Sequence, residues 1–163
     1  MRRMILLPSL ALFLMGCESG PMSAMKDSSK ELHQLVTAEQ VKWEAAPPSL
    51  PPGAKLAALD GDPAKHEFFT MRLWMPDGYR IQPHYHPNYE RVTVLSGTLY
   101  LGEGDRFDES VAKPLPTGSY SSMPPGMHHF GFAKGETVIQ LSSIGPWGIT
   151  YINPADDPRK KQK

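Results

Sequence analysis

The 163-residue sequence lacks the features of several common kinds of protein. It has one cysteine, Cys17, so it forms no intramolecular disulfide. Its 17 basic side chains are balanced by 17 acidic ones. No positive surplus is therefore available to neutralise phosphates, and we expect no nucleic-acid partner. The sequence contains neither the Gly-x-Ser-x-Gly turn of serine hydrolases nor a glycine-rich phosphate loop.

No apolar run is long enough to cross a bilayer. The longest, residues 4–15, is interrupted by Pro8 and Ser9 and has about a dozen apolar residues, where a transmembrane helix needs about 20. It follows the basic pair Arg2-Arg3, as in a secretory signal segment. We therefore predict a signal peptide over residues 1–16.

The end of this run, Leu14-Met15-Gly16-Cys17, resembles the lipobox of bacterial lipoproteins. The resemblance implies lipidation of Cys17, which would anchor the chain to a membrane, with residues 17–40 as a lipidated tether. It also implies a place in the bacterial cell envelope, on the periplasmic side. Glu18 does not resemble the inner-membrane retention signal, which favours the outer membrane of a double-membraned cell. The alternative is an ordinary signal peptide followed by an incidental cysteine.

Proline and glycine are abundant, with 17 and 14 residues. This favours short strands joined by tight turns. We expect a single all-β domain over residues 41–155, a sandwich or barrel of two facing sheets, followed by a polar tail over 156–163. Residues 30–41 are predicted to form a short helix, with an extended segment as the alternative. The expected strands are 55–59, 67–75, 79–86, 91–95, 98–101, 119–122, 129–132, 137–142 and 149–152, with a polar loop over 102–118.

Histidines and one glutamate gather in a pattern typical of a metal site. His84 and His86 are two apart on an expected strand, so both side chains leave the same face. Glu90 has the same parity, and Val92 and Val94 continue the row, which suggests that it faces an apolar interior. Imidazoles and a carboxylate aimed inward are costly unless something satisfies them. A divalent transition metal ion (Fe, Mn, Ni, Cu or Zn) would do so.

Two spaced motifs extend this pattern and resemble those of the cupin superfamily. Gly78-x5-His84-x-His86-x3-Glu90-x6-Gly97 is similar to the first cupin motif, and Gly118-x5-Pro124-x-Gly126-x2-His129 is similar to the second. The resemblance implies a double-stranded β-helix, or jelly-roll, barrel that binds one metal ion inside. The implied ligands are His84, His86, Glu90 and His129. Further segments resemble a group of small uncharacterised bacterial cupins.

Three other side chains are less certain from the sequence. Neighbours on a strand point to opposite faces, so His128 is expected to point away from the metal. Gln140 and Trp147 are candidates for the pocket wall. For Gln140, an outward position in contact with solvent is equally consistent with the sequence. For Trp147, the alternative is packing within the barrel without a role in the pocket.

Two functions fit these residues. The first is an exported, lipid-anchored metalloenzyme acting on a small molecule, with oxygenase chemistry suggested by the cupin resemblance. The second is a non-catalytic lipoprotein that binds or senses a small ligand through its metal. Because both use the same residues, the sequence does not separate them. The cupin resemblance also suggests a homodimer.

Overall fold

The computed structural model describes residues 34–161. The predicted signal peptide, Cys17 and most of the tether lie outside these residues. Within the described part of the chain, no helix is long and apolar enough to cross a bilayer.

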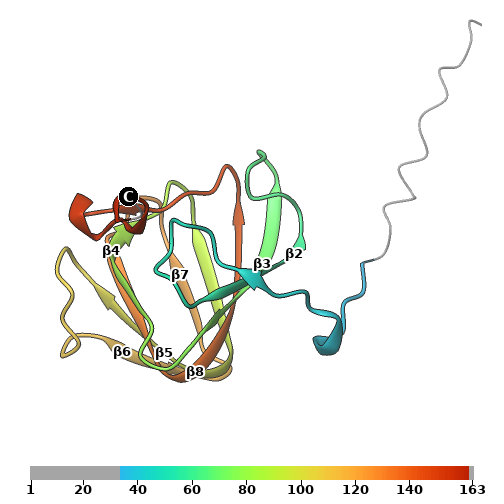
Figure 1. Ribbon diagram of the computed structural model, residues 1–163, viewed down its shortest axis with the longest axis horizontal. Coiled ribbons are helices and arrows are strands. Elements are labelled where there is room, and N and C mark those ends of the chain that lie inside the picture. The colour runs from blue at the N-terminus through green and yellow to red at the C-terminus, as the bar shows by residue number, and fades with distance from the viewer. Residues whose placement is uncertain (1–33, 162–163) are drawn as a thin grey trace, which may run out of the picture. The chain divides into compact units, whose positions relative to one another are not determined.

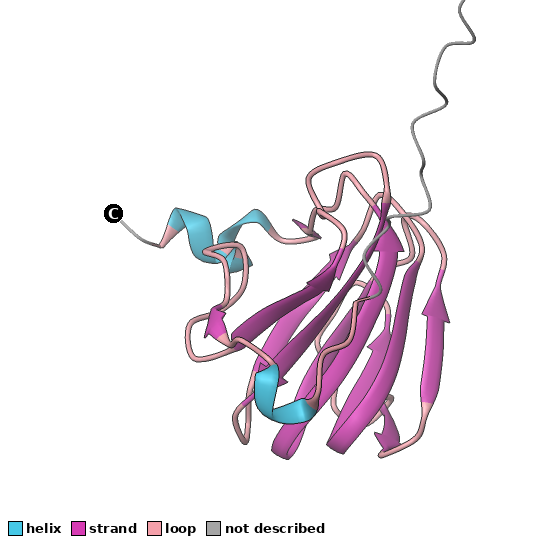
Figure 2. Ribbon diagram, turned by 90° about the vertical axis from the view of Figure 1, so that its right-hand side faces the viewer, coloured by secondary structure: helices cyan, strands magenta, loops and turns pink. Residues whose placement is uncertain are grey.

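Within residues 34–161, nine antiparallel strands form one curled sheet, and helix is confined to short 3-10 turns (Figure 2). The strands are β1 (Glu44–Ala45), β2 (Lys55–Asp60), β3 (Phe68–Met75), β4 (Arg80–Tyr85), β5 (Glu90–Glu103), β6 (Lys113–Pro116), β7 (Tyr120–Met123), β8 (His129–Ile144) and β9 (Thr150–Tyr151). The turns are η2 (Ala38–Gln40), η3 (Pro154–Asp156) and η4 (Pro158–Lys160).

Two long strands, β5 and β8, run through both faces of the barrel (Figure 1). The first half of β5 and the second half of β8 lie in a layer with β2, β3 and β7. The second half of β5 and the first half of β8 lie in a layer with β4, β6 and β9. The expected all-β cupin barrel is therefore confirmed, with its two layers joined through continuous strands.

The bend of β5 occurs at Gly97, where the pairing with β8 shifts register. Gly97 has φ +75°, and a Cβ atom there would lie 2.3 Å from the backbone oxygen of Glu136. Only glycine fits this conformation and this close approach. Opposite it, the buried hydroxyl of Thr137 accepts a hydrogen bond from the Thr98 N–H at 3.2 Å.

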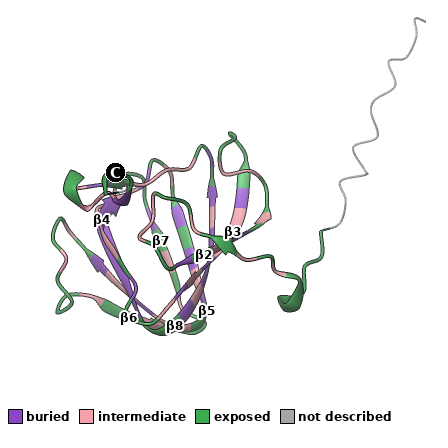
Figure 3. Cartoon of the chain, viewed as in Figure 1, coloured by how far each residue is buried: buried purple, intermediate pink, exposed green. Residues whose placement is uncertain are grey.

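The interior between the layers is apolar, and buried positions concentrate on the strands (Figure 3). Val92 and Val94 are 2% and 1% exposed, which places their even-numbered row inside, as the sequence predicts. They pack with Leu73, Met75 and Ile139 in the main core cluster. Burial of these side chains on both layers is the main force that holds the barrel closed.

Several local features differ from the sequence-based expectation. Residues 34–41 contain only the three-residue turn η2, with extended backbone at Thr37 and Val41 on either side of it, so the expected helix over 30–41 is wrong for these residues. Ser96-Gly97 is a bend within β5 and not a turn between two strands, and β8 is one strand where two were expected. The expected polar loop over 102–118 contains β6, which pairs with the second half of β5.

Candidate metal centre

The structure brings together the four side chains that the sequence predicts as metal ligands. One ligand atom from each of His84, His86, Glu90 and His129 lies within 4.8 Å of the others. His84 is on β4, His86 follows that strand, Glu90 opens β5 and His129 opens β8. Between 3% and 7% of each residue is exposed, so the whole cluster is buried.

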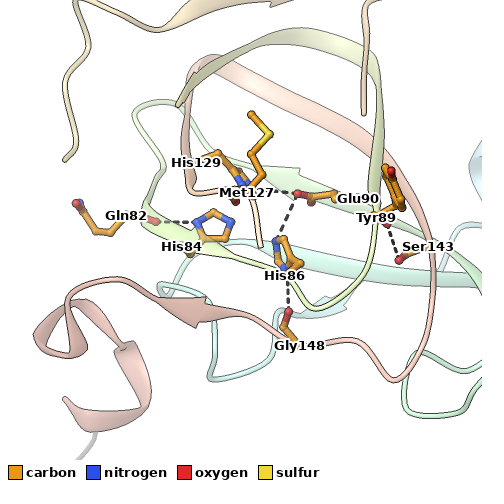
Figure 4. Close-up of polar contacts among 9 residues, drawn as sticks. All are labelled: Gln82, His84, His86, Tyr89, Glu90, Met127, His129, Ser143 and Gly148. Atoms are coloured by element: carbon orange, nitrogen blue, oxygen red, sulfur yellow. Dashed lines mark hydrogen bonds and ion pairs between the residues drawn. The ribbon is translucent and has the colours of Figure 1, made fainter. Parts of the chain in front are cut away.

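Each imidazole is oriented by a backbone carbonyl (Figure 4). The Nδ1 atom of His84 lies 2.7 Å from the Gln82 oxygen, that of His86 lies 2.6 Å from the Gly148 oxygen, and that of His129 lies 2.9 Å from the Met127 oxygen. A carbonyl oxygen only accepts, so each Nδ1 carries the proton and donates. Each neutral ring then keeps its lone pair on Nε2, which is the arrangement a metal ligand needs.

Glu90 completes the cluster with a negative charge. Its Oε2 atom lies 3.1 Å from His129 Nε2 and 3.4 Å from His86 Nε2. Burial alone would raise the pKa of Glu90, but the adjacent His86 and His129 lower it to about 2. The carboxylate is therefore ionised throughout the physiological range.

The histidines differ in how they hold a proton when no metal ion is present. Burial, reinforced by the neighbouring His129, lowers the pKa of His84 to about 3. Burial also lowers the pKa of His86. Burial opposes protonation of His129, but the hydrogen bond and the negative charge of Glu90, together with the Met127 carbonyl, outweigh burial and raise the pKa of His129. In the metal-free protein, the raised pKa of His129 and the lowered pKa of Glu90 both favour a buried ion pair between these two residues.

The donor set fits a divalent transition metal ion. Three imidazole nitrogens and one carboxylate oxygen face one another, and all four are acceptors once His129 loses its proton. Such a group is stable in a buried place only with a cation among its members. Imidazole and carboxylate suit Fe, Mn, Ni, Cu and Zn, and the donors alone do not select among these ions.

A cavity of about 520 Å³ adjoins the cluster. His84, His86 and Glu90 form part of its wall, and the rest is mostly aliphatic. A second, smaller cavity of about 40 Å³ lies against His84, Glu90 and His129. The cluster therefore contacts both cavities, and the larger one is of a size that accepts small molecules.

The two candidate pocket residues have different positions. Trp147 lines the large cavity and stacks on His86, with ring centroids 4.1 Å apart and an angle of 14° between the ring planes. Gln140 does not line it: its neighbours Ile139 and Leu141 do, and Gln140 points to the opposite face of β8. There it accepts a 3.3 Å hydrogen bond from Arg72 Nε.

His128 lies outside the cluster, as strand alternation predicts. Its Nδ1 atom is 2.6 Å from the carboxylate of Asp105, and its ring stacks on Tyr85 with centroids 5.4 Å apart. About 40% of its side chain is exposed. His128 is therefore a partly exposed residue whose described ring contacts are with Tyr85 and Asp105, and not with the four candidate ligands.

The sequence analysis missed the part of the wall formed by residues 44–50. This segment contributes Glu44, Ala45, Pro47, Ser49 and Leu50 to the large cavity. Two buried tyrosines hold it: Tyr151 donates to the Ser49 oxygen at 2.8 Å and Tyr79 to the Pro51 oxygen at 2.6 Å. The prolines that indicate an extended chain here gave no sign of which face the segment covers.

The fold and the site together define a cupin-type barrel whose three histidines and one glutamate could hold a divalent metal ion. The chain belongs to a cupin-like family, described as Domain of unknown function (DUF4437), whose model matches residues 28–154. A search of curated proteins gave no match.

Solved structures agree on the fold. The polyketide cyclase RemF from Streptomyces resistomycificus is 19% identical, with a TM-score of 0.62, over 77% of this chain and 89% of that one. A candidate acetylacetone dioxygenase from Methylibium petroleiphilum PM1 is 17% identical, with a TM-score of 0.58, over 76% and 83%. An RmlC-like cupin from Shewanella frigidimarina NCIMB 400 is 19% identical, with a TM-score of 0.54, over 69% and 91%.

Proposed function

We propose that this chain is a metal-dependent enzyme of the oxygenase type that acts on a small molecule. We further propose that it is exported and anchored to the cell envelope through a lipid on Cys17. The observation that carries the enzymatic proposal is the cluster of His84, His86, Glu90 and His129 against a cavity of about 520 Å³. The proposal of a lipid anchor is supported by the lipobox-like sequence alone.

The residues of this chain would hold the metal ion, orient its ligands and enclose the bound molecule. Backbone carbonyls fix the three imidazoles so that each Nε2 is directed into the cluster. Glu90 supplies a negative charge that a divalent ion would balance, and Trp147 covers one face of His86. A bound ion would serve as a Lewis acid or as a redox centre for dioxygen. The mostly aliphatic wall makes the surroundings of the cluster less polar, which would strengthen electrostatic interactions within the site.

The remaining wall offers little other chemistry. Besides the cluster, the polar side chains that line the large cavity are those of Glu44 and Ser49. Neither is paired with a histidine in the described contacts, so the wall holds no activated nucleophile of the serine–histidine type. The reaction is therefore assigned to the cluster.

The structural neighbours are consistent with small-molecule chemistry but do not define a reaction. One is a polyketide cyclase and another a candidate acetylacetone dioxygenase. Their identities to this chain are 19% and 17%. A shared fold does not fix a shared function, and they support the oxygenase proposal only as analogy.

The alternative function is a non-catalytic lipoprotein that binds or senses a small ligand through its metal. It uses the same four ligands and the same cavity. Metal identity in protein purified without added metal separates the two. Fe, Mn, Cu or Ni together with oxygen uptake supports the enzyme. Zn or no fixed metal, with ligand binding and no turnover in a metabolite screen, supports the binding protein.

The test of the metal site compares two neighbouring histidines. His129→Ala removes one of four ligands, so after extensive dialysis it should retain little or no metal. His128→Ala is the matched control, because it removes the adjacent imidazole and its contact with Asp105 while leaving the cluster intact. It should keep the stoichiometric metal of the wild type, measured as metal per protein. Loss from His128→Ala with retention in His129→Ala would refute the assignment.

Homodimer formation stays a prediction. Sedimentation of the purified domain over a wide concentration range tests it, and a strict monomer at high concentration would remove it.

A further inference from the structure

We propose that the large cavity takes an uncharged, mainly apolar molecule that carries oxygen donors at one end only. The proposal rests on the proposed function, because the oxygen end would coordinate the ion held by the cluster. It goes beyond that function in naming the chemical class of the ligand.

The wall of the cavity is overwhelmingly hydrocarbon. Both layers of the barrel contribute side chains, and the loops contribute the rest. The apolar side chains are those of Ala45, Pro47, Leu50, Leu56, Pro63, Ala64, Met71, Leu73, Ile81, Ile139, Leu141, Trp147 and Ile149. Such a surface gains free energy from covering apolar ligand atoms and, outside the cluster, offers few hydrogen bonds to a sugar or another polyol.

The carboxylates of Glu44 and Glu90 give the wall negative charge. Among residues 34–161, no lysine or arginine lines the cavity. Arg72, on the layer that forms much of the wall, points to its other face and contacts Gln140. Outside the cluster, the charged lining residue is Glu44, which is exposed on β1. A phosphate or carboxylate on the body of a ligand would therefore lose its hydration without gaining a cation, which is strongly unfavourable.

The position of the cluster sets the orientation of the ligand. His84, His86 and Glu90 are the polar part of the wall, and Leu56, Met71 and Leu141 belong to its apolar part. The oxygen donors of a ligand then meet the cluster and its apolar body covers the hydrocarbon wall. A volume of about 520 Å³ admits a molecule well beyond the size of a two-carbon chelator.

The test uses hydroxamic acids, which present the same pair of oxygen donors on different tails. Their binding to the Co(II)-loaded protein is measured by calorimetry and by the visible spectrum of Co(II). Octanohydroxamic acid should bind more tightly than acetohydroxamic acid by about fourfold for each methylene that enters the cavity. Suberic acid monohydroxamate and 8-aminooctanohydroxamic acid, whose tails end in a charge, should bind at least about tenfold more weakly than octanohydroxamic acid.

A paired substitution tests whether the wall itself makes this choice. Ile149 lines the cavity and belongs to neither core cluster, so Ile149→Lys adds a cation there at small risk to folding. It should raise affinity for suberic acid monohydroxamate and lower it for octanohydroxamic acid. Ile144→Lys is the control, because Ile144 is 48% exposed and does not line the cavity. It should leave the order of the probes unchanged, and unaltered acetohydroxamic acid binding shows that both variants are folded.

The outcomes separate this inference from the proposed function. A protein that binds no Co(II) contradicts the proposed function and the inference together. A protein that binds Co(II) and acetohydroxamic acid, but binds octanohydroxamic acid no more tightly, overturns the apolar ligand alone. Tightest binding of either charged probe also overturns it, in favour of an ionic ligand.

Discussion

The metal-free protein should lose stability in mild acid because of His84. This imidazole is 4% exposed, and burial lowers its pKa from 6.5 to about 3. In the unfolded chain it regains its ordinary pKa and binds a proton below pH 6.5, whereas the folded chain does not. The stability that neutral His84 contributes is therefore complete above pH 6.5 and is lost as the pH falls toward 3.

The size of this loss follows from the pKa shift. One pKa unit corresponds to about 1.4 kcal/mol, so the full shift is worth about 5 kcal/mol of unfolding free energy, of which about 2 kcal/mol is lost by pH 5. The window from pH 7 to 5 is chosen because Glu90, with its pKa lowered to about 2, stays ionised in the folded state, and its unfolded pKa of 4.5 lies below the window.

The assay is urea unfolding of chelator-treated protein at pH 7 and pH 5, for the wild type and for His84→Gln. The raised pKa of His129 stabilises the fold as the pH falls to 6.5, and the lowered pKa of His86 destabilises it below 6.5. The difference between the two proteins removes most of these contributions. Wild type should lose about 2 kcal/mol more than His84→Gln. Equal losses would show that His84 is not held neutral by burial, and the description of the cluster would be wrong.

Three further predictions concern other parts of the chain. Cys17→Ser should release the processed protein from membranes and abolish lipid incorporation, and a variant that fractionates with membranes as before, with no lipid in either form, would refute the anchor. Binding of Cu(II) or Co(II) should quench tryptophan fluorescence, because Trp147 stacks 4.1 Å from the ring of His86. The Trp147→Phe variant should lose most of this quenching. The control variant Trp74→Phe should keep it, because the Trp74 ring packs under Lys55 and not against a ligand. Gly97→Ala should destabilise the fold by more than Gly78→Ala. A Cβ atom added at Gly78 meets no atom within 4 Å, so this control costs only about 1–2 kcal/mol for its positive φ. Equal free energies of unfolding for the two variants would show that the approach of Gly97 to Glu136 is not tight.

Parity predicted that His84, His86 and Glu90 share a face, whereas His129 joined them through the resemblance to the second cupin motif. Side chains two apart on a strand share a face, so His84 and His86 were certain to point together, and alternation separated His128 from His129. Val92 and Val94 extended the same face into the core. These inferences depend only on local backbone geometry, which the sequence controls directly.

Other features depended on contacts that no local pattern reports. Gln140 would have been placed outward had Thr137–Ser143 been recognised as one regular strand, since its odd-numbered residues are buried and its even-numbered ones are not. The sequence around Gly135 suggests a turn. Because the length of such a turn is not known from the sequence, alternation from His129 does not predict which face Gln140 occupies. In β5 the opposite occurs: Val94 and Leu99 are both buried although their parity differs, because the register shifts at Gly97.

The carbonyl partners of the three imidazoles have a consequence for how this site can change over time. Gln82, Met127 and Gly148 orient the histidines through main-chain oxygens, which are the same for every amino acid. Replacing any of these residues by another amino acid leaves the acceptor in place, and a carbonyl does not titrate. The orientation of the ligands is therefore robust to mutation as long as the backbone path is kept. Sequence around the cluster is free to drift, so a chain of this kind can acquire a new ligand preference in its cavity wall without rebuilding its metal centre.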